Sequence, residues 1–135
     1  MSDVSKMVKE WADAWSAHDL GRVTELFTDE CDYEDVTLGV VNHGKSELDQ
    51  FGQGFIAALP DVTFALESIV AGDGRAAAEW TMVGTQTGDL PGLPATGKRC
   101  SVRGASVFEV RGDRFVRCAD YWDMMTFLRQ LGHID

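Results

Sequence analysis

The chain has 135 residues, of which 44% are hydrophobic and 25% charged, as expected for one soluble globular domain over residues 1–135. Its formal net charge of −10 argues against nucleic acid or an anionic membrane as a partner, because both bind basic surfaces. No apolar run approaches the roughly 20 residues of a membrane-spanning helix, and the N-terminal segment lacks the apolar core of a signal peptide. The cysteines have no metal-ligand spacing, so we expect reduced thiols in a cytoplasmic protein: Cys31, Cys100 and Cys118.

The first half of the chain is predicted to be mainly helical. Apolar residues recur at helical spacing in the opening segment, namely Val4, Met7, Val8, Trp11 and Trp15. Residues 18–21 interrupt this pattern, and a short second helix is expected to carry Val23, Leu26 and Phe27. The stretch CDYEDVTLG, residues 31–39, is predicted to be the opening strand, followed by a turn around residues 42–44. A third helix is expected to be capped near Ser46 and to end at Pro60.

From Val62 onward the hydrophobic pattern changes to period two, which predicts strands over residues 62–71, 74–87, 97–110 and 114–123. Hairpin turns are expected at residues 72–74 and 111–113, and the longer link GDLPGLPATG is a candidate lid. A short final helix is expected to end at Gly132. The order predicts an α+β fold in which a strongly curved, mostly antiparallel sheet has helices over its concave face, enclosing a pocket.

Strand alternation identifies two carboxylates that should point inward. Tyr33 and Asp35 share one face of their strand, opposite Asp32 and Glu34. The same alternation places Asp120 on the inner face of the last strand, together with Val116, Cys118 and Trp122. Two buried acids raise each other's pKa and titrate as a pair, which can supply a general base and a general acid near neutral pH. We therefore predict that Asp35 and Asp120 are catalytic.

Both acids also have a purely structural interpretation. Asp35 could cap the turn at residues 37–39, and Asp120 could pair with Arg103 or Arg117. Trp15 is interpreted as core. The inward aromatic and apolar residues around the acids suit a flat, largely apolar ligand with a carbonyl or hydroxyl group. The predicted substrate-binding residues are Trp11, Tyr33, Phe55, Trp80, Met82, Ser106, Phe108, Cys118 and Trp122.

Two stretches carry a resemblance to the nuclear transport factor 2-like superfamily, which has a cone-shaped α+β barrel. WADAWSAHDLGRVTELFTDECDYEDVTLG resembles the opening of ketosteroid isomerases, with their helix, aspartate turn, "LF", acidic pair and "E-D-x-x-G". This resemblance implies that Asp35 occupies the position of the isomerases' general base. GTQTGDLPGLPATGK followed by DYWDMMTFLRQLG resembles the SnoaL-like polyketide cyclases, which use an acid on the last strand. Asp120 is the best match for that acid, and Asp123 is the second.

The same resemblance shows where this chain departs from related enzymes. The two oxyanion donors of the isomerases match Trp11 and Ser106, a different donor pair. GDRFVRCADYWD also resembles limonene epoxide hydrolases, but their Arg-x-Asp pair is replaced by Trp80-Thr81-Met82, so epoxide hydrolysis is not expected. Scytalone dehydratases use paired pocket histidines, whereas the histidines here fall in turns or at the end: His18, His43 and His133.

The leading prediction is a cofactor-independent enzyme, with no metal, that transfers a proton next to a carbonyl of an apolar, cyclic substrate. The outcome is cyclisation or isomerisation. The alternative is a non-catalytic module of the same fold that binds a small ligand or dimerises. An open cavity with free acids favours the enzyme, and acids neutralised by arginine favour the module. A homodimer is expected through an apolar band on the outer sheet face: Ala77, Thr81, Val83, Ala105 and Val107.

Overall fold

The computed structural model describes residues 3–135. Within these residues the chain forms four helices: α1 (Asp3–Ser16), α2 (Leu20–Glu25), α3 (Gly44–Ala58) and α4 (Met124–Leu131). The same residues form six strands: β1 (Phe27–Asp35), β2 (Val40–His43), β3 (Thr63–Gly72), β4 (Arg75–Thr85), β5 (Arg99–Arg111) and β6 (Arg114–Trp122).

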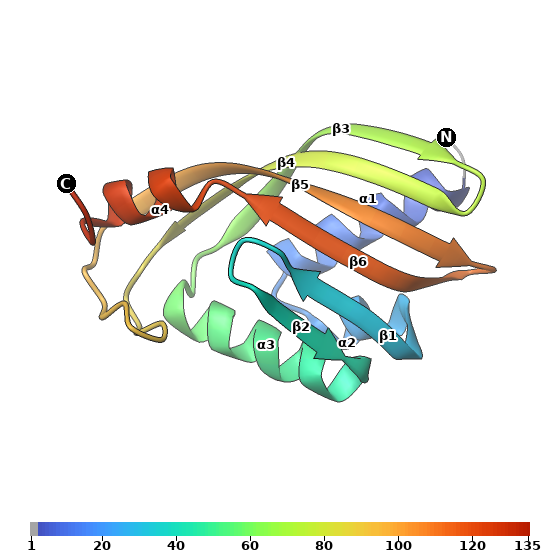
Figure 1. The fold of residues 1–135 in the computed structure, drawn as a ribbon, viewed down its shortest axis with the longest axis horizontal. Helices are drawn as coiled ribbons and strands as arrows, with labels where there is room; N and C mark the ends of the chain where they lie inside the picture. The colour runs from blue at the N-terminus through green and yellow to red at the C-terminus, as the bar shows by residue number, and fades with distance from the viewer. Residues whose placement is uncertain (1–2) are drawn as a thin grey trace.

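The strands form a single mixed sheet in the order β2-β1-β6-β5-β4-β3. Strand β1 runs parallel to β6, and every other neighbouring pair is antiparallel. The sheet is curved and open, with α1 and α3 against one face and α4 at the end where the chain finishes (Figure 1). The predicted α+β fold with a curved, mostly antiparallel sheet is confirmed.

Helix α1 forms because its apolar residues repeat at helical spacing and can be buried along one side. Val8, Trp11, Ala12 and Trp15 are all buried. The chain leaves α1 through His18, the one described non-glycine residue with a positive φ, 59°. Asp19 then caps α2, its side chain accepting a hydrogen bond from the backbone N–H of Arg22 at 3.1 Å. The break predicted at residues 18–21 is therefore present at His18 and Asp19, whereas Leu20 and Gly21 already belong to α2.

The second helix is shorter than predicted, because Phe27 belongs to β1 and not to α2. Phe27 is fully buried and lies opposite Phe115 of β6, with 5.3 Å between the ring centroids. The backbone N–H of Phe115 donates to the carbonyl of Leu26 at 2.7 Å. Pairing with a distant strand thus overrides the local helical spacing at Leu26 and Phe27.

The predicted turn at residues 42–44 is also wrong. Residues Val40–His43 form β2, which pairs antiparallel with the end of β1, and the turn lies before it, where Gly39 has φ 73°. Consequently α3 starts at Gly44, earlier than the predicted cap at Ser46. The backbone N–H of His43 donates to Oε1 of Glu47 at 2.8 Å, which supplies part of a capping box.

One inward assignment in β6 is corrected. Phe115 is fully buried, whereas Val116, predicted to face inward, is only half-buried. The register between β5 and β6 shifts between Glu109 and Val110, and this bulge changes which residues face inward at the start of β6. Beyond the bulge Cys118 and Asp120 are buried as predicted.

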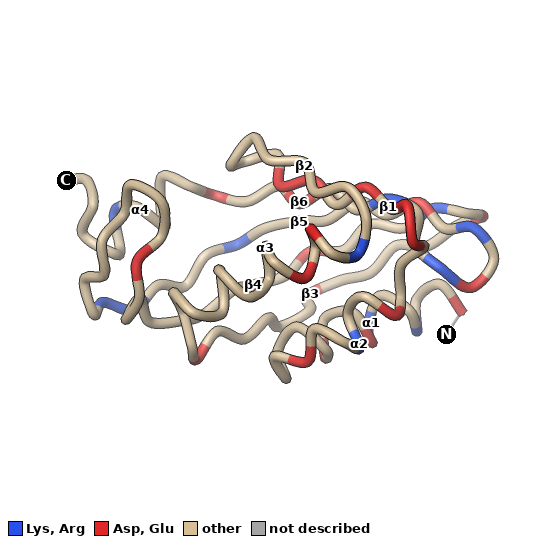
Figure 2. The backbone as a smooth tube through the Cα atoms, turned by 90° about the horizontal axis from the view of Figure 1, so that it is seen from below, with Lys and Arg blue, Asp and Glu red and all other residues tan. Residues whose placement is uncertain are grey.

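The surface is acidic, in keeping with the composition. Figure 2 shows Lys and Arg positions dispersed among more numerous Asp and Glu positions on helices and strands. Several charges on the outer sheet face are paired, including Arg103 with Glu79 at 3.8 Å. Among residues 3–135, no helix is both long enough and apolar enough to cross a membrane.

Candidate active site

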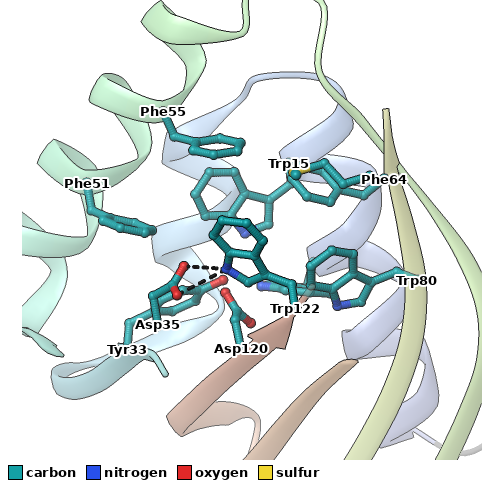
Figure 3. A pocket seen from close by; sticks show the side chains of 11 residues that line it. Trp15, Tyr33, Asp35, Phe51, Phe55, Phe64, Trp80, Asp120 and Trp122 are labelled. Atoms are coloured by element: carbon teal, nitrogen blue, oxygen red, sulfur yellow. Dashed lines mark hydrogen bonds between the residues drawn. The ribbon is translucent and has the colours of Figure 1, made fainter. Parts of the chain in front are cut away.

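Asp35 lies at the end of β1 and faces the space between the sheet and α3 (Figure 3). It is only 5% exposed. The indole N–H of Trp122 donates to both of its oxygens, at 3.1 Å to Oδ1 and 3.0 Å to Oδ2. The backbone N–H of Leu38 also donates to Oδ1, at 2.9 Å. Asp35 therefore caps the turn after β1 and faces the pocket at once, so its two interpretations are compatible.

Asp120 lies on β6, directly opposite Asp35 in the parallel register of β1 and β6. It is 9% exposed. The hydroxyl of Ser106 donates to its Oδ1 at 2.5 Å, and the thiol of Cys118 lies 3.4 Å from the same oxygen. Ser106 in turn accepts a hydrogen bond from the indole N–H of Trp80 at 2.9 Å. A chain of donors thus runs from Trp80 through Ser106 to Asp120.

Burial sets the proton affinity of both acids. Burial raises the pKa of Asp120 to about 6, further supported by the negative charge of Asp35, while the hydrogen bonds from Ser106 and Tyr33 act in the opposite direction. Burial also raises the pKa of Asp35, although the hydrogen bonds from Trp122 and the turn backbone favour its charged form. The neighbouring Tyr33 hydroxyl has its pKa raised well above the ordinary value by burial and by Asp120. Both carboxyls therefore retain protons at higher pH than exposed aspartates.

Neither predicted structural partner reaches Asp120. Arg103 pairs with Glu79 at 3.8 Å, and Arg117 pairs with Glu34 at 3.4 Å, both on the outer face. The second candidate for the acid, Asp123, lies outside the pocket lining and caps α4. It accepts hydrogen bonds from the backbone and hydroxyl of Thr126, which lower its pKa.

The inner pocket is a small aromatic chamber around the two acids. Six of the predicted substrate-binding residues line it, together with Asp35 and Asp120: Trp11, Tyr33, Phe55, Trp80, Met82 and Trp122. Its volume, taken as the space open to the centres of water-sized spheres, is about 40 Å³. By that measure the chamber has room for about three water molecules.

Three residues of the lining are not among the predicted substrate contacts, namely Trp15, Phe51 and Phe64. Trp15 was assigned to the core, but it lies four residues after Trp11 on the same side of α1 and reaches the same chamber. Phe51 had a usable signal, because it lies four residues before Phe55 on α3. Phe64 comes from the edge strand β3, whose face could be assigned only from its pairing with β4.

The other three predicted contacts lie behind the lining. Ser106, Phe108 and Cys118 are fully buried and do not border the inner pocket. Ser106 and Cys118 instead contact Asp120 from the sheet side. Phe108 packs edge-on against Trp11, with 4.9 Å between the ring centroids.

A second, outer cavity of about 260 Å³ on the same measure adjoins the inner pocket. Phe55 and Trp122 line both spaces and so form the wall between them. The remaining lining is apolar and comes from the turn after β1, the start of β2, the β4–β5 loop and α4: Leu38, Val40, Leu90, Pro91, Leu93, Met124 and Phe127.

Gln86, at the start of the β4–β5 loop, fixes the part of this loop that lines the outer cavity. It is fully buried, and its amide N–H donates to the carbonyl of Leu93 at 2.8 Å. Its amide oxygen lies 2.8 Å from Nε2 of His133, beyond α4. The backbone N–H of Gly88 donates to the carbonyl of Ala58 at 3.0 Å, so the loop is also joined to the end of α3. The β4–β5 loop, which contains the predicted lid segment, is therefore anchored to the end of α3 and to the segment that follows α4.

Within residues 3–135, no group of three His, Cys, Asp or Glu side chains is placed to hold a metal ion. The chemistry offered by the described residues is that of two carboxyls in an aromatic chamber.

Comparison with solved structures shows the fold. TsrD from Streptomyces laurentii is 23% identical, with a TM-score of 0.87 and coverage of 98% of this chain and 96% of that one. A protein with a ketosteroid isomerase-like fold from Catenulispora acidiphila, in complex with trimethylamine, is 20% identical, with a TM-score of 0.84 and coverage of 93% and 92%. IdmH from Streptomyces antibioticus, a candidate polyketide cyclase, is 24% identical, with a TM-score of 0.81 and coverage of 95% and 97%.

No functionally curated protein matches the sequence. The family model described as SnoaL-like polyketide cyclase matches residues 5–131, nearly the whole chain. This match agrees with the curved sheet and with the resemblance in the loop and last strand. The chain belongs to the SnoaL-like polyketide cyclase family.

Proposed function

We propose that this protein is a cofactor-independent enzyme that transfers a proton next to a carbonyl of a small apolar, cyclic substrate. The observation that carries the proposal is the pairing of Asp35 with Asp120 across β1 and β6, both facing one aromatic chamber. Among the described residues, neither acid forms an ion pair with arginine or lysine. Family membership supports a small-molecule, cyclase-type function.

The proposed step needs no further reactant. A carboxylate removes a proton from the carbon next to the carbonyl, and the electrons of that C–H bond form an enolate. The enolate carbon then attacks another carbonyl of the same molecule, which closes a ring, or a proton returns at a different carbon, which isomerises the substrate. In the ring closure, the second acid donates a proton to the oxygen of the attacked carbonyl. In the isomerisation, it donates a proton to the carbon that gains hydrogen.

The surroundings of the two acids favour different roles. Two hydrogen bonds from Trp122 stabilise the charged form of Asp35, which suits a general base. The pKa of Asp120 is about 6, so a minority of these carboxyls still carry a proton at neutral pH and can donate it. A group with a pKa near the working pH can both donate and accept a proton.

The two cavities together indicate the shape of the substrate. The inner chamber is smaller than a fused-ring compound, whereas the outer cavity is larger and apolar. A substrate would place its reacting carbonyl beside the acids and its remaining apolar body in the outer cavity. Phe55 and Trp122 would then have to turn aside, because they form the wall between the two spaces.

Proton transfer can be tested without the natural substrate. Cyclic ketones such as 1-indanone exchange the hydrogens next to the carbonyl for deuterium in D₂O, and proton NMR follows the loss of signal. We expect the protein to catalyse this exchange, and Asp35→Asn and Asp120→Asn to lower the rate roughly 10²- to 10⁴-fold. Glu34→Gln, next to Asp35 but on the outer face, is the control and should retain the rate. Equal exchange by all four proteins would refute the proposal.

A binding module is the second candidate, favoured by one observation. Aromatic rings surround two carboxyls in a chamber of about 40 Å³, an arrangement that also suits a small alkylammonium ion. The Catenulispora acidiphila protein was solved with trimethylamine. Calorimetry with trimethylamine distinguishes the two functions: tight binding at neutral pH together with no ketone exchange supports the module.

We also propose that two copies associate through the outer face of β4 and β5. The predicted band of Ala77, Thr81, Val83, Ala105 and Val107 is at least partly exposed. Positive and negative side chains flank this band, such as Arg75 and Glu109, which lie 3.4 Å apart. A second copy can therefore place its own charges opposite partners of the other sign. Sedimentation should show a dimer that Val107→Arg converts to a monomer.

The free, buried thiols support the expectation of a reducing, cytoplasmic location.

A further inference from the structure

The chain has four tryptophans, and all four line the inner pocket. Two of their indole N–H groups have acceptors: Trp80 donates to Ser106, and Trp122 donates to Asp35. The other two, on Trp11 and Trp15, are buried and have no hydrogen-bond partner among the described residues. A buried donor without an acceptor destabilises a fold, and few such groups occur in native proteins.

The position of Trp15 makes its N–H available to a ligand. The residue is only 5% exposed, and its ring is fixed by Tyr33 and Phe64, whose centroids lie 6.2 and 6.1 Å away. In Figure 3 its nitrogen lies on the edge of the ring nearer to Asp35 and Asp120. Trp11, one helical turn earlier, has its nitrogen near the Tyr33 hydroxyl without forming a hydrogen bond of normal geometry. Trp15 is therefore the clearer free donor.

Among the described residues, no acceptor in the chamber is hydrogen-bonded to Trp15. The Asp35 carboxylate already accepts from Trp122 and from the turn, and Asp120 is bonded from the sheet side by Ser106. An anionic ligand would be repelled by two neighbouring acids. The acceptor that suits Trp15 is thus an uncharged oxygen carried in by an apolar ligand, as in a ketone.

We infer that the Trp15 N–H binds the carbonyl oxygen of the substrate, with Trp11 alongside. The inference rests on the proposed function, for which it names the group that stabilises the enolate. When a carboxylate removes the neighbouring proton, the carbonyl oxygen gains negative charge, and a fixed donor in a dry chamber stabilises that charge. In this role Trp15 replaces Ser106, whose hydroxyl is committed to Asp120. The pocket therefore selects apolar compounds that have an acceptor oxygen at their inner end.

The test uses the full chain labelled with ¹⁵N, with 1-indanone and its oxygen-free analogue indane as probes. We expect 1-indanone to move the indole N–H resonance of Trp15 downfield. Indane has no acceptor oxygen, so it should not cause this downfield shift. The resonance of Trp80 is the internal control, because its N–H already donates to Ser106. Binding of 1-indanone without the Trp15 shift, or the absence of binding at millimolar concentration, overturns the inference.

A variant gives a second, independent measurement. Trp15→Phe keeps an aromatic ring but removes the donor, so it should weaken 1-indanone binding roughly 3- to 10-fold and leave indane binding unchanged. Equal losses for both probes indicate a packing role and contradict the inference. This result can be distinguished from the test of the proposed function. If 1-indanone shifts the Trp15 resonance but no deuterium exchange occurs, Trp15 binds the carbonyl and the proposed proton transfer is wrong. Exchange without the shift does the reverse.

Discussion

The indole N–H of Trp122 donates to both carboxylate oxygens of Asp35, although 87 residues separate them in the chain. These bonds favour the charged form of Asp35 against the effect of burial. Trp122→Phe removes both bonds and keeps an aromatic ring, so we expect the pKa of Asp35 to rise further above its ordinary value. Carbon-detected NMR titration of the Asp35 carboxyl measures this change.

The matched control for that variant is Tyr121→Phe. Tyr121 is the neighbouring residue on β6, but it points to the outer face and is 46% exposed. Its hydroxyl is remote from the pocket side of the strand, so the pKa of Asp35 should stay as in the parent. An unchanged titration in Trp122→Phe would show that the indole bonds do not hold Asp35 in its charged form.

Asp120 should make stability depend on pH. Its pKa rises from 3.8 to about 6 on folding, so the folded state holds the proton more tightly than the unfolded state. The favourable contribution of the protonated form is present below about pH 4 and is lost as pH rises through about 6. The shift corresponds to about 3 kcal/mol at most.

Asp120→Asn removes this pH dependence, because the amide stays neutral. We expect the variant to equal or exceed the parent in free energy of unfolding at pH 8, and to lose that advantage near pH 4. Urea denaturation at the two pH values measures the difference. A variant that is less stable than the parent at pH 8 by as much as at pH 4 would contradict the assigned pKa.

The chain also offers a matched pair of glycines. A Cβ on Gly104 would overlap the six-membered ring of buried Trp80, so Gly104→Ala should destabilise the fold by about 1–3 kcal/mol. A Cβ on Gly54, within α3, would meet no atom within 4 Å, so Gly54→Ala should stabilise the fold by about 1 kcal/mol. Thermal unfolding of both variants gives the comparison, and the same sign for both would be inconsistent with the close approach of β5 to Trp80.

Gln86 is expected to control the order of the β4–β5 loop. Gln86→Ala leaves the carbonyl of Leu93 and Nε2 of His133 without their partner, so we expect a loss of about 1–3 kcal/mol of stability. Hydrogen exchange of residues 86–98 should become faster. His133→Ala removes only one of the two side-chain bonds and should have the smaller effect. Unchanged exchange in Gln86→Ala would mean that the backbone contacts of the loop suffice.

The sequence was most informative where periodicity reports burial directly. Alternation placed Tyr33 and Asp35 on the inner face of their strand, and both are buried. It failed at Val116, because Val116 is the extra residue of a bulge in β6 that has no opposite residue in β5, and the hydrophobic pattern does not reveal such a bulge. The strand at Val40–His43 was missed because four residues are too few for a periodic signal.

The donor network of the site was less accessible to sequence reasoning. Nothing in the pattern indicates that Trp122 would bind Asp35 or that Ser106 would be committed to Asp120, since both depend on strand register. Gln86 and Phe64 were missed for a related reason: their environment is created by loops and strands that meet only in the folded chain. Local patterns therefore identify the acids, while tertiary pairing determines their partners.

The parallel pairing of β1 with β6 has a consequence for synthesis on the ribosome. Asp35 is made early, but the strand that brings Asp120 beside it is the last one before the closing helix. The two acids cannot meet until nearly the whole chain has emerged, because Asp120 lies on β6, the last strand in the chain. A nascent chain halted before residue 114 would carry Asp35 with neither its indole donor nor its partner acid. Any chemistry that depends on both acids is therefore confined to finished molecules.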